Sequence, residues 1–149
     1  MTKEKIQGSV YTRRYVYNFH YHLIWSTMYR YQIFADKKLA NEMTDMLQMI
    51  AADNNIAIEQ MEVMPDHVHV LISFPPSKAP TSAIKALKGR SAFIFLKRHP
   101  EIRQSEYWGG HLWASSYYMS TFGSMSKEVA ENFISNQKYN AYPKKTKKN

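Results

Sequence analysis

The chain of 149 residues contains no cysteine, which excludes a disulfide framework, a thiol nucleophile and a thiolate metal site. Acidic residues are scarce: 12 Asp and Glu stand against 20 Lys and Arg, giving a net charge of +8. No apolar run approaches the roughly 20 residues of a membrane-spanning helix, and the N-terminal segment lacks an apolar signal core. We therefore expect a soluble, intracellular protein, not in a membrane, with a polyanionic partner.

The length and composition predict one folded domain over residues 1–149. A chain of this size can bury a substantial core, and 44% hydrophobic with 14% aromatic residues is not the composition of a disordered chain. Two basic segments flank the domain. Residues 1–13 are expected to form a loose basic arm, and residues 143–149 a disordered basic tail.

Two histidines separated by one apolar residue, His67 and His69, occupy a β-rich run at 64–72. Successive side chains of a strand alternate between faces, so both imidazoles point the same way, together with Leu71. Two imidazoles about 7 Å apart along a rigid strand can hold one divalent cation and leave its other positions open. The spacing alone is equally compatible with two partly buried histidines that bond to the backbone.

The periodicity of the chain predicts an α+β fold. The expected elements are a strand at 15–26, a helix at 36–53, strands at 56–64 and 67–74 joined by a turn or bulge at 65–66, a helix at 81–98, a strand at 114–122 and a helix at 126–139. The first six elements predict a ferredoxin-like or RRM-like antiparallel sheet with helices on one face. The seventh is an additional C-terminal helix. The same architecture serves RNA-binding domains, so the fold alone does not decide the function.

Details within these elements carry further expectations. Asp36 is expected to cap the first helix, whose apolar stripe includes Met43 and Met46. Gly89 inside the second helix indicates a close backbone approach, either to a neighbouring element or to DNA. A rival histidine pair, His20 and His22, shares the second face of the first strand, and for it we favour a structural or DNA-contacting role.

The run MPDHVHVLISF at 64–74 resembles the His-hydrophobe-His (HUH) signature of nucleases that act on single-stranded DNA. It is most similar to that of the TnpA transposases, the single-tyrosine HUH enzymes of very small bacterial and archaeal insertion sequences. Further blocks appear in the order typical of that family, and the resemblance covers about residues 14–138. These blocks are YHLIW at 21–25, YR at 29–30, KALKGRS at 85–91, LW at 112–113, SY at 116–117 and the segment 129–137.

The resemblance implies a transposase that cleaves and joins single-stranded DNA, recognising hairpins at the ends of an insertion sequence. In the family, a tyrosine on the last helix attacks a DNA phosphate and becomes linked to the 5′ phosphate. The resemblance also implies a homodimer in which the last helix docks on its own site or on its partner's. No nucleotide cofactor is expected, and the expected location is the cytoplasm, in association with the nucleoid.

The implied site residues fall into two sets. His67, His69 and Gln137 are the expected ligands of a divalent metal ion, Mg²⁺ or Mn²⁺. The expected DNA-binding residues are Arg13, Arg14, Tyr29, Arg30, Lys85, Lys88 and Arg90.

Phe133 is the one departure from the family pattern of a tyrosine, three residues and a glutamine. Phenylalanine has no hydroxyl and cannot be a nucleophile, so the chain is expected to be catalytically inactive. We favour a deliberate Tyr→Phe change, which deletes one oxygen and keeps the ring. A naturally inactive binding protein and the use of Tyr139 as a substitute nucleophile are the other two interpretations.

Two alternative functions remain open. One is a non-catalytic RRM-like nucleic-acid-binding protein, in which strand aromatics such as Tyr15, Tyr17 and Tyr21 stack on bases. The other is a repeat-associated, domesticated relative with the same chemistry. A convergence of His67, His69 and Gln137 would distinguish the enzyme from the binder, which has no use for a metal triad.

Overall fold

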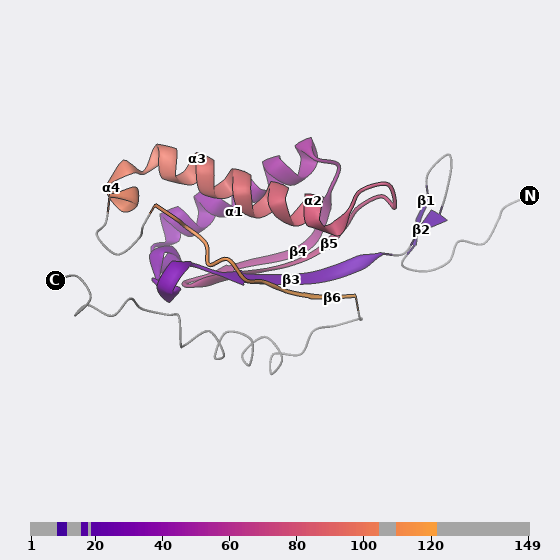
Figure 1. The fold of residues 1–149 in the computed structure, drawn as a ribbon, viewed down its shortest axis with the longest axis horizontal. Coiled ribbons are helices and arrows are strands. Elements are labelled where there is room, and N and C mark those ends of the chain that lie inside the picture. Colours follow the sequence, from indigo (N-terminus) through magenta and orange to yellow (C-terminus); the bar gives the residue numbers. More distant parts are fainter. Residues whose placement is uncertain (1–8, 12–15, 18, 105–109, 122–149) are drawn as a thin grey trace, which may run out of the picture.

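The computed structural model describes residues 9–11, 16–17, 19–104 and 110–121. Its centre is a four-stranded sheet in the order β4-β5-β3-β6, and every neighbouring pair is antiparallel. The strands are β3 (His20–Ser26), β4 (Ala57–Met64), β5 (His67–Ser73) and β6 (Tyr118–Ser120). Both long helical segments lie on one face of this sheet (Figure 1). The ferredoxin-like order and the one-sided helices confirm the predicted fold class.

The first helix, α1 (Lys37–Asp53), follows the predicted boundaries closely. The Asp36 side chain accepts a hydrogen bond from the backbone N–H of Lys38 at 2.9 Å, as expected of an N-cap. The predicted apolar stripe faces the sheet, with Met43, Met46 and two further side chains almost fully buried. Helix–sheet packing thus follows directly from the spacing of apolar residues.

The second helical segment runs without a break from Pro80 to Arg98 but contains a π-helical insertion. It consists of α2 (Pro80–Ile84), the π-helical η3 (Lys85–Arg90) and α3 (Ser91–Arg98). Gly89 lies inside η3, and a Cβ built there would meet no atom of the described residues within 4 Å. Within this part of the chain, the expected close approach of a neighbouring element at Gly89 is therefore not found. Single-turn π-helices recur at functional sites.

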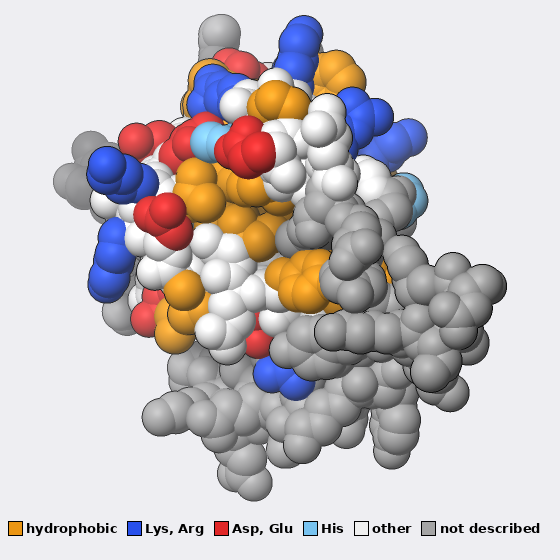
Figure 2. Space-filling view, turned by 90° about the vertical axis from the view of Figure 1, so that its left-hand side faces the viewer, with side chains coloured by type: hydrophobic (Ala, Val, Ile, Leu, Met, Phe, Trp, Pro, Cys, Tyr) orange, Lys and Arg blue, Asp and Glu red, His pale blue; other side chains and the backbone are white. Residues whose placement is uncertain are grey.

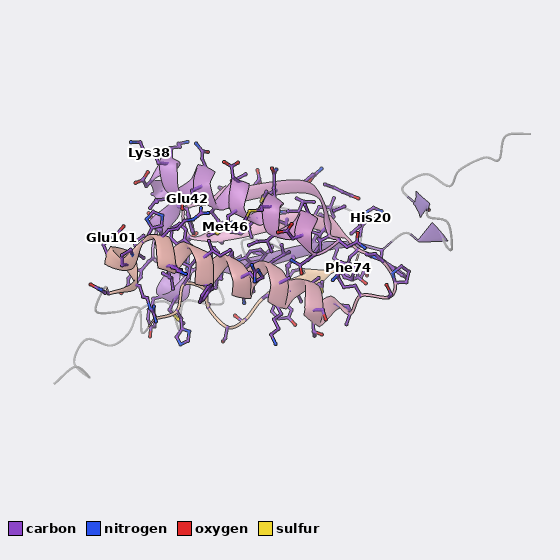
Figure 3. The ribbon with its side chains drawn as sticks, turned by 90° about the horizontal axis from the view of Figure 1, so that it is seen from above. His20, Lys38, Glu42, Met46, Phe74 and Glu101 are labelled. Atoms are coloured by element: carbon purple, nitrogen blue, oxygen red, sulfur yellow. The ribbon has the colours of Figure 1, made fainter. Side chains whose placement is uncertain are left out.

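A short helix, α4 (Pro100–Arg103), follows α3 in the connection to β6. At this end the His99 ring lies between two carboxylates: Nε2 is 2.9 Å from Glu42 of α1, and Nδ1 is 3.3 Å from Glu101. Figure 2 shows a histidine between acidic side chains on this side of the molecule, and Figure 3 places Glu42 and Glu101 at the same end of the helical layer. The contact joins the two helices of the layer.

The N-terminal strand differs from the prediction. Instead of one strand at 15–26, the structure has β2 (Val16–Tyr17) separate from β3, and β2 pairs with β1 (Val10–Tyr11). Part of the expected loose arm thus forms a small two-stranded sheet, for which the β-branched and aromatic residues Val and Tyr are well suited.

The last predicted strand, 114–122, is reduced to the three residues of β6. The carbonyls that precede β6 accept from the Lys88 ammonium instead: Nζ donates to the carbonyl oxygens of Ala114, Ser115 and Ser116 at 2.9, 3.4 and 3.3 Å. Two short 3-10 turns, η1 (Met28–Arg30) and η2 (Ile33–Ala35), connect β3 to α1. The predicted helix at 126–139 lies outside the described residues.

Among the described residues, no helix combines the length and the apolar character needed to span a lipid bilayer.

We predict that Ser91 is needed for packing of the helical layer against the loop that precedes β6. Its Oγ accepts a 2.9 Å hydrogen bond from the indole Nε1 of Trp113, and both side chains are buried. Ser91→Ala leaves the indole N–H without an acceptor, so the free energy of unfolding should fall by about 1–3 kcal/mol. Urea denaturation measures the change. Ser82→Ala, at an exposed position of the same helical segment, is the control and should change stability by much less. Equal effects would contradict the prediction.

Candidate active site

The face of the sheet that the helices leave open carries the two predicted metal ligands. Strand pairing sets His69 opposite Ile24 and His67 opposite Ser26 across β3 and β5, and directly paired residues share a face. The apolar residues that alternate with them on β5 and β3 face the helices and belong to the core: Val68, Val70, Ile72, Leu23 and Trp25. The alternation predicted for the histidine strand is therefore confirmed, and it leaves His67 and His69 only partly buried.

The imidazole of His67 is held by a carboxylate that the sequence prediction did not single out. Its Nδ1 lies 3.0 Å from Oδ1 of Asp66, and Oδ2 of Asp66 lies 3.3 Å from Nε of Arg30. The hydrogen bond to His67 is the main cause that lowers the pKa of Asp66, and the charges of His67 and Arg30 act in the same direction. The carboxylate is thus ionised at neutral pH and acts only as an acceptor.

The imidazole of His69 has a different neighbour. Its Nε2 lies 3.2 Å from Nδ1 of the buried His22, and the two rings are tilted by 38°. Burial lowers the pKa of His69, and the neighbouring His22 and His67 lower it further, against an opposing effect of Glu62. Glu62 is the residue paired with His69 on β4. At neutral pH the His69 ring is therefore uncharged, the form in which a histidine binds metal.

A hollow of about 410 Å³ lies beside His69 on the β4 side. Its lining residues are Gln60, Met61, Glu62, His69 and Leu71.

The rival pair does not act as a pair. Nδ1 of the His20 ring lies 2.9 Å from Oε2 of Glu59, whereas His22 contacts His69. Glu59 reaches His20 because a bulge shifts the β4–β5 register between Ile58 and Gln60. His22 thus adds a third imidazole to the open face, next to one of the two predicted ligands.

Tyr29 and Arg30, two predicted DNA-binding residues, lie at the same end of the sheet as His67. Both adopt the left-handed conformation, with φ of 57° and 58°. For non-glycine residues this conformation is uncommon and strained, and such strain gathers at functional sites. The Tyr29 ring meets Tyr31 edge-on, with centroids 5.9 Å apart, and the Arg30 guanidinium binds Asp66.

The other described DNA-binding candidates belong to the helical layer, across the sheet from the histidines. Lys85 and Arg90 are exposed in η3. Lys88 is half-buried and is engaged with the three carbonyls of residues 114–116; burial lowers its pKa to about 8. Lys88 lines a cavity together with Met28, the residue before Tyr29, and the role of these cations in DNA binding stays a prediction.

Four predicted site residues lie outside the described residues: Arg13, Arg14, Phe133 and Gln137. Within the described part of the chain, no group of three His, Asp or Glu side chains could hold a metal ion. A cation at His67 and His69 would therefore need at least one ligand from elsewhere, which is the place that the sequence assigns to Gln137.

The residues that sequence reasoning missed are Asp66 and Glu62. Asp66 immediately precedes His67, and this position beside a metal-ligand candidate was the available signal. Glu62 carries no local signal, since only the register of β4 on β5 sets it opposite His69.

The chain matches the protein-family model "Transposase IS200 like" over residues 15–137. It is 40% identical over 125 residues to the ISDra2 transposase TnpA of Deinococcus radiodurans, an alignment that covers 84% of this chain and 88% of the relative. It is 26% identical over 121 residues to the transposase of insertion sequence element IS200 of Salmonella typhimurium, covering 81% and 78% of the two chains.

Solved structures show the same likeness. A crystal structure of a proposed transposase of Deinococcus radiodurans R1 superimposes with a TM-score of 0.78 at 38% identity, covering 86% of this chain and 97% of the other. A tyrosine transposase associated with REP sequences, solved with a REP hairpin, superimposes with a TM-score of 0.50 at 14% identity, covering 89% and 75%. The second likeness shows the fold alone.

We predict that His69 makes the metal-free protein less stable in acid. Because its pKa is lowered in the folded state, the unfolded chain binds the proton more readily, so stability falls as the pH drops below the ordinary histidine value of 6.5. His69→Gln removes this contribution and should lose less stability between about pH 7.5 and 5.5. Urea denaturation at several pH values measures it. His111→Gln, at an exposed histidine, should follow the unmodified chain; an identical loss in His69→Gln would refute the prediction.

Proposed function

The chain belongs to the IS200-like transposase family, whose members move insertion sequences, and we propose that it acts on single-stranded DNA hairpins at the ends of such an element. The observation that carries the proposal is the pair of imidazoles on the open face of the sheet, one backed by the Asp66 carboxylate and the other kept neutral by burial. This arrangement suits metal-dependent phosphoryl transfer.

Two of the described side chains, His67 and His69, are the proposed contribution of the sheet to a divalent cation site. Because the ionised Asp66 accepts from Nδ1 of His67, the other ring nitrogen keeps its lone pair for a ligand. His67 and His69 would hold the ion, together with Gln137 through its amide oxygen. Imidazole ligands suit Mn²⁺, and Mg²⁺ is the ion of greater availability. The bound ion would supply Lewis-acid polarisation of the scissile phosphate.

The proposed chemistry needs a hydroxyl that this chain lacks. With a tyrosine at position 133, the phenolic oxygen would bond to phosphorus while the bond to the 3′ oxygen breaks. The phenol proton is lost, and the 3′ oxygen leaves as a hydroxyl. The phenol pKa near 10 makes the phosphotyrosine a competent leaving group in the reverse step. With Phe133, we propose that the protein binds DNA and metal without cleaving.

The proposed partners follow from the net charge and from the similarity to known transposases. The net charge of +8 favours a polyanion, and the hairpin in the structure of the REP-associated transposase supports a hairpin ligand here. We further propose a homodimer that works in the cytoplasm, on the nucleoid, and needs no nucleotide cofactor.

An RRM-like binding protein without catalytic ancestry is less well supported. Such a protein would stack bases on aromatic side chains of the open sheet face. Of the tyrosines considered for this role, Tyr21 lies on the helical side and stacks on Phe74, with centroids 4.8 Å apart. The open face carries histidines and Glu62 instead.

We predict that the unmodified chain binds one Mn²⁺ ion through His67 and His69. In isothermal titration calorimetry, the double variant His67→Ala, His69→Ala should lose affinity by more than about tenfold, or roughly 1.4 kcal/mol. His111→Ala, at an exposed histidine, is the matched control and should bind like the unmodified chain. Equal Mn²⁺ affinity of the double variant and the unmodified chain would show that His67 and His69 are not the metal ligands.

We also predict that Phe133→Tyr restores cleavage. The change adds one oxygen to a ring already present, and because covalent catalysis depends on that group, the gain should be nearly all-or-none. The assay resolves labelled hairpin DNA on denaturing gels with Mg²⁺ and detects a protein-linked 5′ phosphate and a free 3′-OH.

Two controls accompany this assay. The unmodified chain should bind the hairpin but form no covalent adduct with it, and Phe133→Leu should behave in the same way. If the unmodified chain cleaves the hairpin and Tyr139→Phe abolishes this cleavage, Tyr139 is the nucleophile instead. If Phe133→Tyr does not cleave hairpins from its own element, the proposed reaction is wrong.

A further inference from the structure

The carboxylate of Asp66 contacts two side chains from different parts of the chain. Oδ1 accepts from Nδ1 of His67 at 3.0 Å, and Oδ2 accepts from Nε of Arg30 at 3.3 Å. The Asp66 residue is only 9% exposed. A buried carboxylate with both oxygens engaged has little freedom to change partners.

The backbone holds this carboxylate in place. Asp66 belongs to the two-residue turn between β4 and β5, and its carbonyl accepts from the backbone N–H of Thr27 at 3.0 Å and from the Thr27 hydroxyl at 3.3 Å. The neighbouring carbonyl of Pro65 accepts from the N–H of Phe34 at 3.0 Å. The turn is thus fastened to the segment that follows β3, which also carries Arg30.

The path of that segment brings Arg30 to Asp66 at a conformational cost. Tyr29 and Arg30 are consecutive left-handed residues, each of which costs on the order of 1 kcal/mol or more. Two hydrogen bonds stabilise this backbone conformation. The carbonyl of Thr27 accepts from the N–H of Arg30 at 3.0 Å, and the Thr27 hydroxyl donates to the carbonyl of Tyr31 at 2.7 Å. Within the described part of the chain, Asp66 is the partner of the Arg30 guanidinium.

The Asp66 carboxylate, which accepts from both Arg30 and His67, determines which nitrogen of the His67 ring carries the proton. We propose that Arg30 and Asp66 are positioning residues that fix His67 in its Nδ1–H tautomer, so that Nε2 is the nitrogen that keeps a lone pair. Arg30 thereby acts through Asp66 on the histidine, in addition to any contact with DNA. The inference rests on the proposed function for its purpose, but the tautomer exists without metal or DNA and is measured without them.

Asp66→Asn is the sharpest test, because it keeps the side-chain volume and reverses one hydrogen bond. An amide has one acceptor side and one donor side. Since the Nε–H of Arg30 is a donor, the amide oxygen turns to Arg30 and the amide N–H₂ faces His67. Nδ1 of His67 must then accept, which moves the ring proton to Nε2. The same logic makes an Asp→Asn change impose the wrong histidine tautomer in serine proteases, a known case.

The orienting effect of Arg30 gives a rescue experiment. In the double variant Arg30→Met, Asp66→Asn, the amide no longer faces a donor and can turn its oxygen to His67. The Nδ1–H tautomer should then return, at least in part. A residue that only stabilised the turn would give additive damage in the double variant and no return of the tautomer.

The measurement is two-bond ¹H–¹⁵N NMR on the full chain labelled at histidine, free of metal and DNA, at about pH 8, where an ordinary histidine is neutral. His67→Gln assigns the signal among the six histidines. The matched controls are the same two changes at exposed positions of the helical layer: Asp45→Asn on α1 and Arg98→Met on α3. We expect Nδ1–H in the unmodified chain and both controls, Nε2–H in Asp66→Asn, and Nδ1–H again in the double variant.

Calorimetry with Mn²⁺ is the second readout. Loss of an outer partner of a metal-binding histidine lowers metal affinity by about 10–100-fold, and Asp66→Asn should fall in that range. Nε2–H in the unmodified chain, or an Asp66→Asn variant with unchanged tautomer, overturns the inference. If the unmodified chain binds no Mn²⁺, the proposed metal site fails, while the tautomers still decide the role of Arg30 and Asp66.

Discussion

The pairing of β3 with β5 is the constraint on which the site depends. The pairing places Leu23 opposite Val70 and Ile24 opposite His69. A slip of one residue would turn every side chain of a strand to the other face. Val68 and Val70, now fully buried, would face outward, and each buried side chain of this size contributes about 1.5–3 kcal/mol. The apolar residues of β5 therefore fix the direction of its histidines.

The same pairing brings the functional ends of distant segments together. The segment after β3 contacts the β4–β5 turn through Thr27 and Asp66, and contacts the loop before β6 through the N–H of Met28 and the carbonyl of Leu112, 2.8 Å apart. The left-handed Tyr29 and Arg30 follow these attachments, and beyond them the N–H of Phe34 donates to the carbonyl of Pro65 at 3.0 Å. Hydrogen bonds on both sides maintain a backbone path that these two residues would not adopt by themselves.

The features that follow from short-range periodicity were predictable from the sequence. The extent of α1, its Asp36 cap and the alternation of β5 all rest on patterns within a few residues. The features that were wrong or missed depend on distant partners. The carbonyls of residues 114–116, predicted to lie in a strand, accept hydrogen bonds from Lys88, which is 26 to 28 residues away in the chain. The contact of His22 with His69 and the bulge at Glu59 depend on register, which local patterns do not specify.

The organisation of the core bears on the origin of Phe133. The core cluster of the described residues is built from side chains between Leu23 and Trp113, and the sequence has no hydroxyl at position 133. Loss of that hydroxyl removes chemistry while the histidines and the carboxylate behind His67 stay in place. A protein long used only for binding would have no need of strained residues beside Asp66, since strain of 1–3 kcal/mol per residue lowers stability. The supporting contacts around the histidines, together with a single missing oxygen in the sequence, are what we expect of one isolated Tyr→Phe change and not of gradual conversion to a binding protein; this origin of Phe133 stays a prediction.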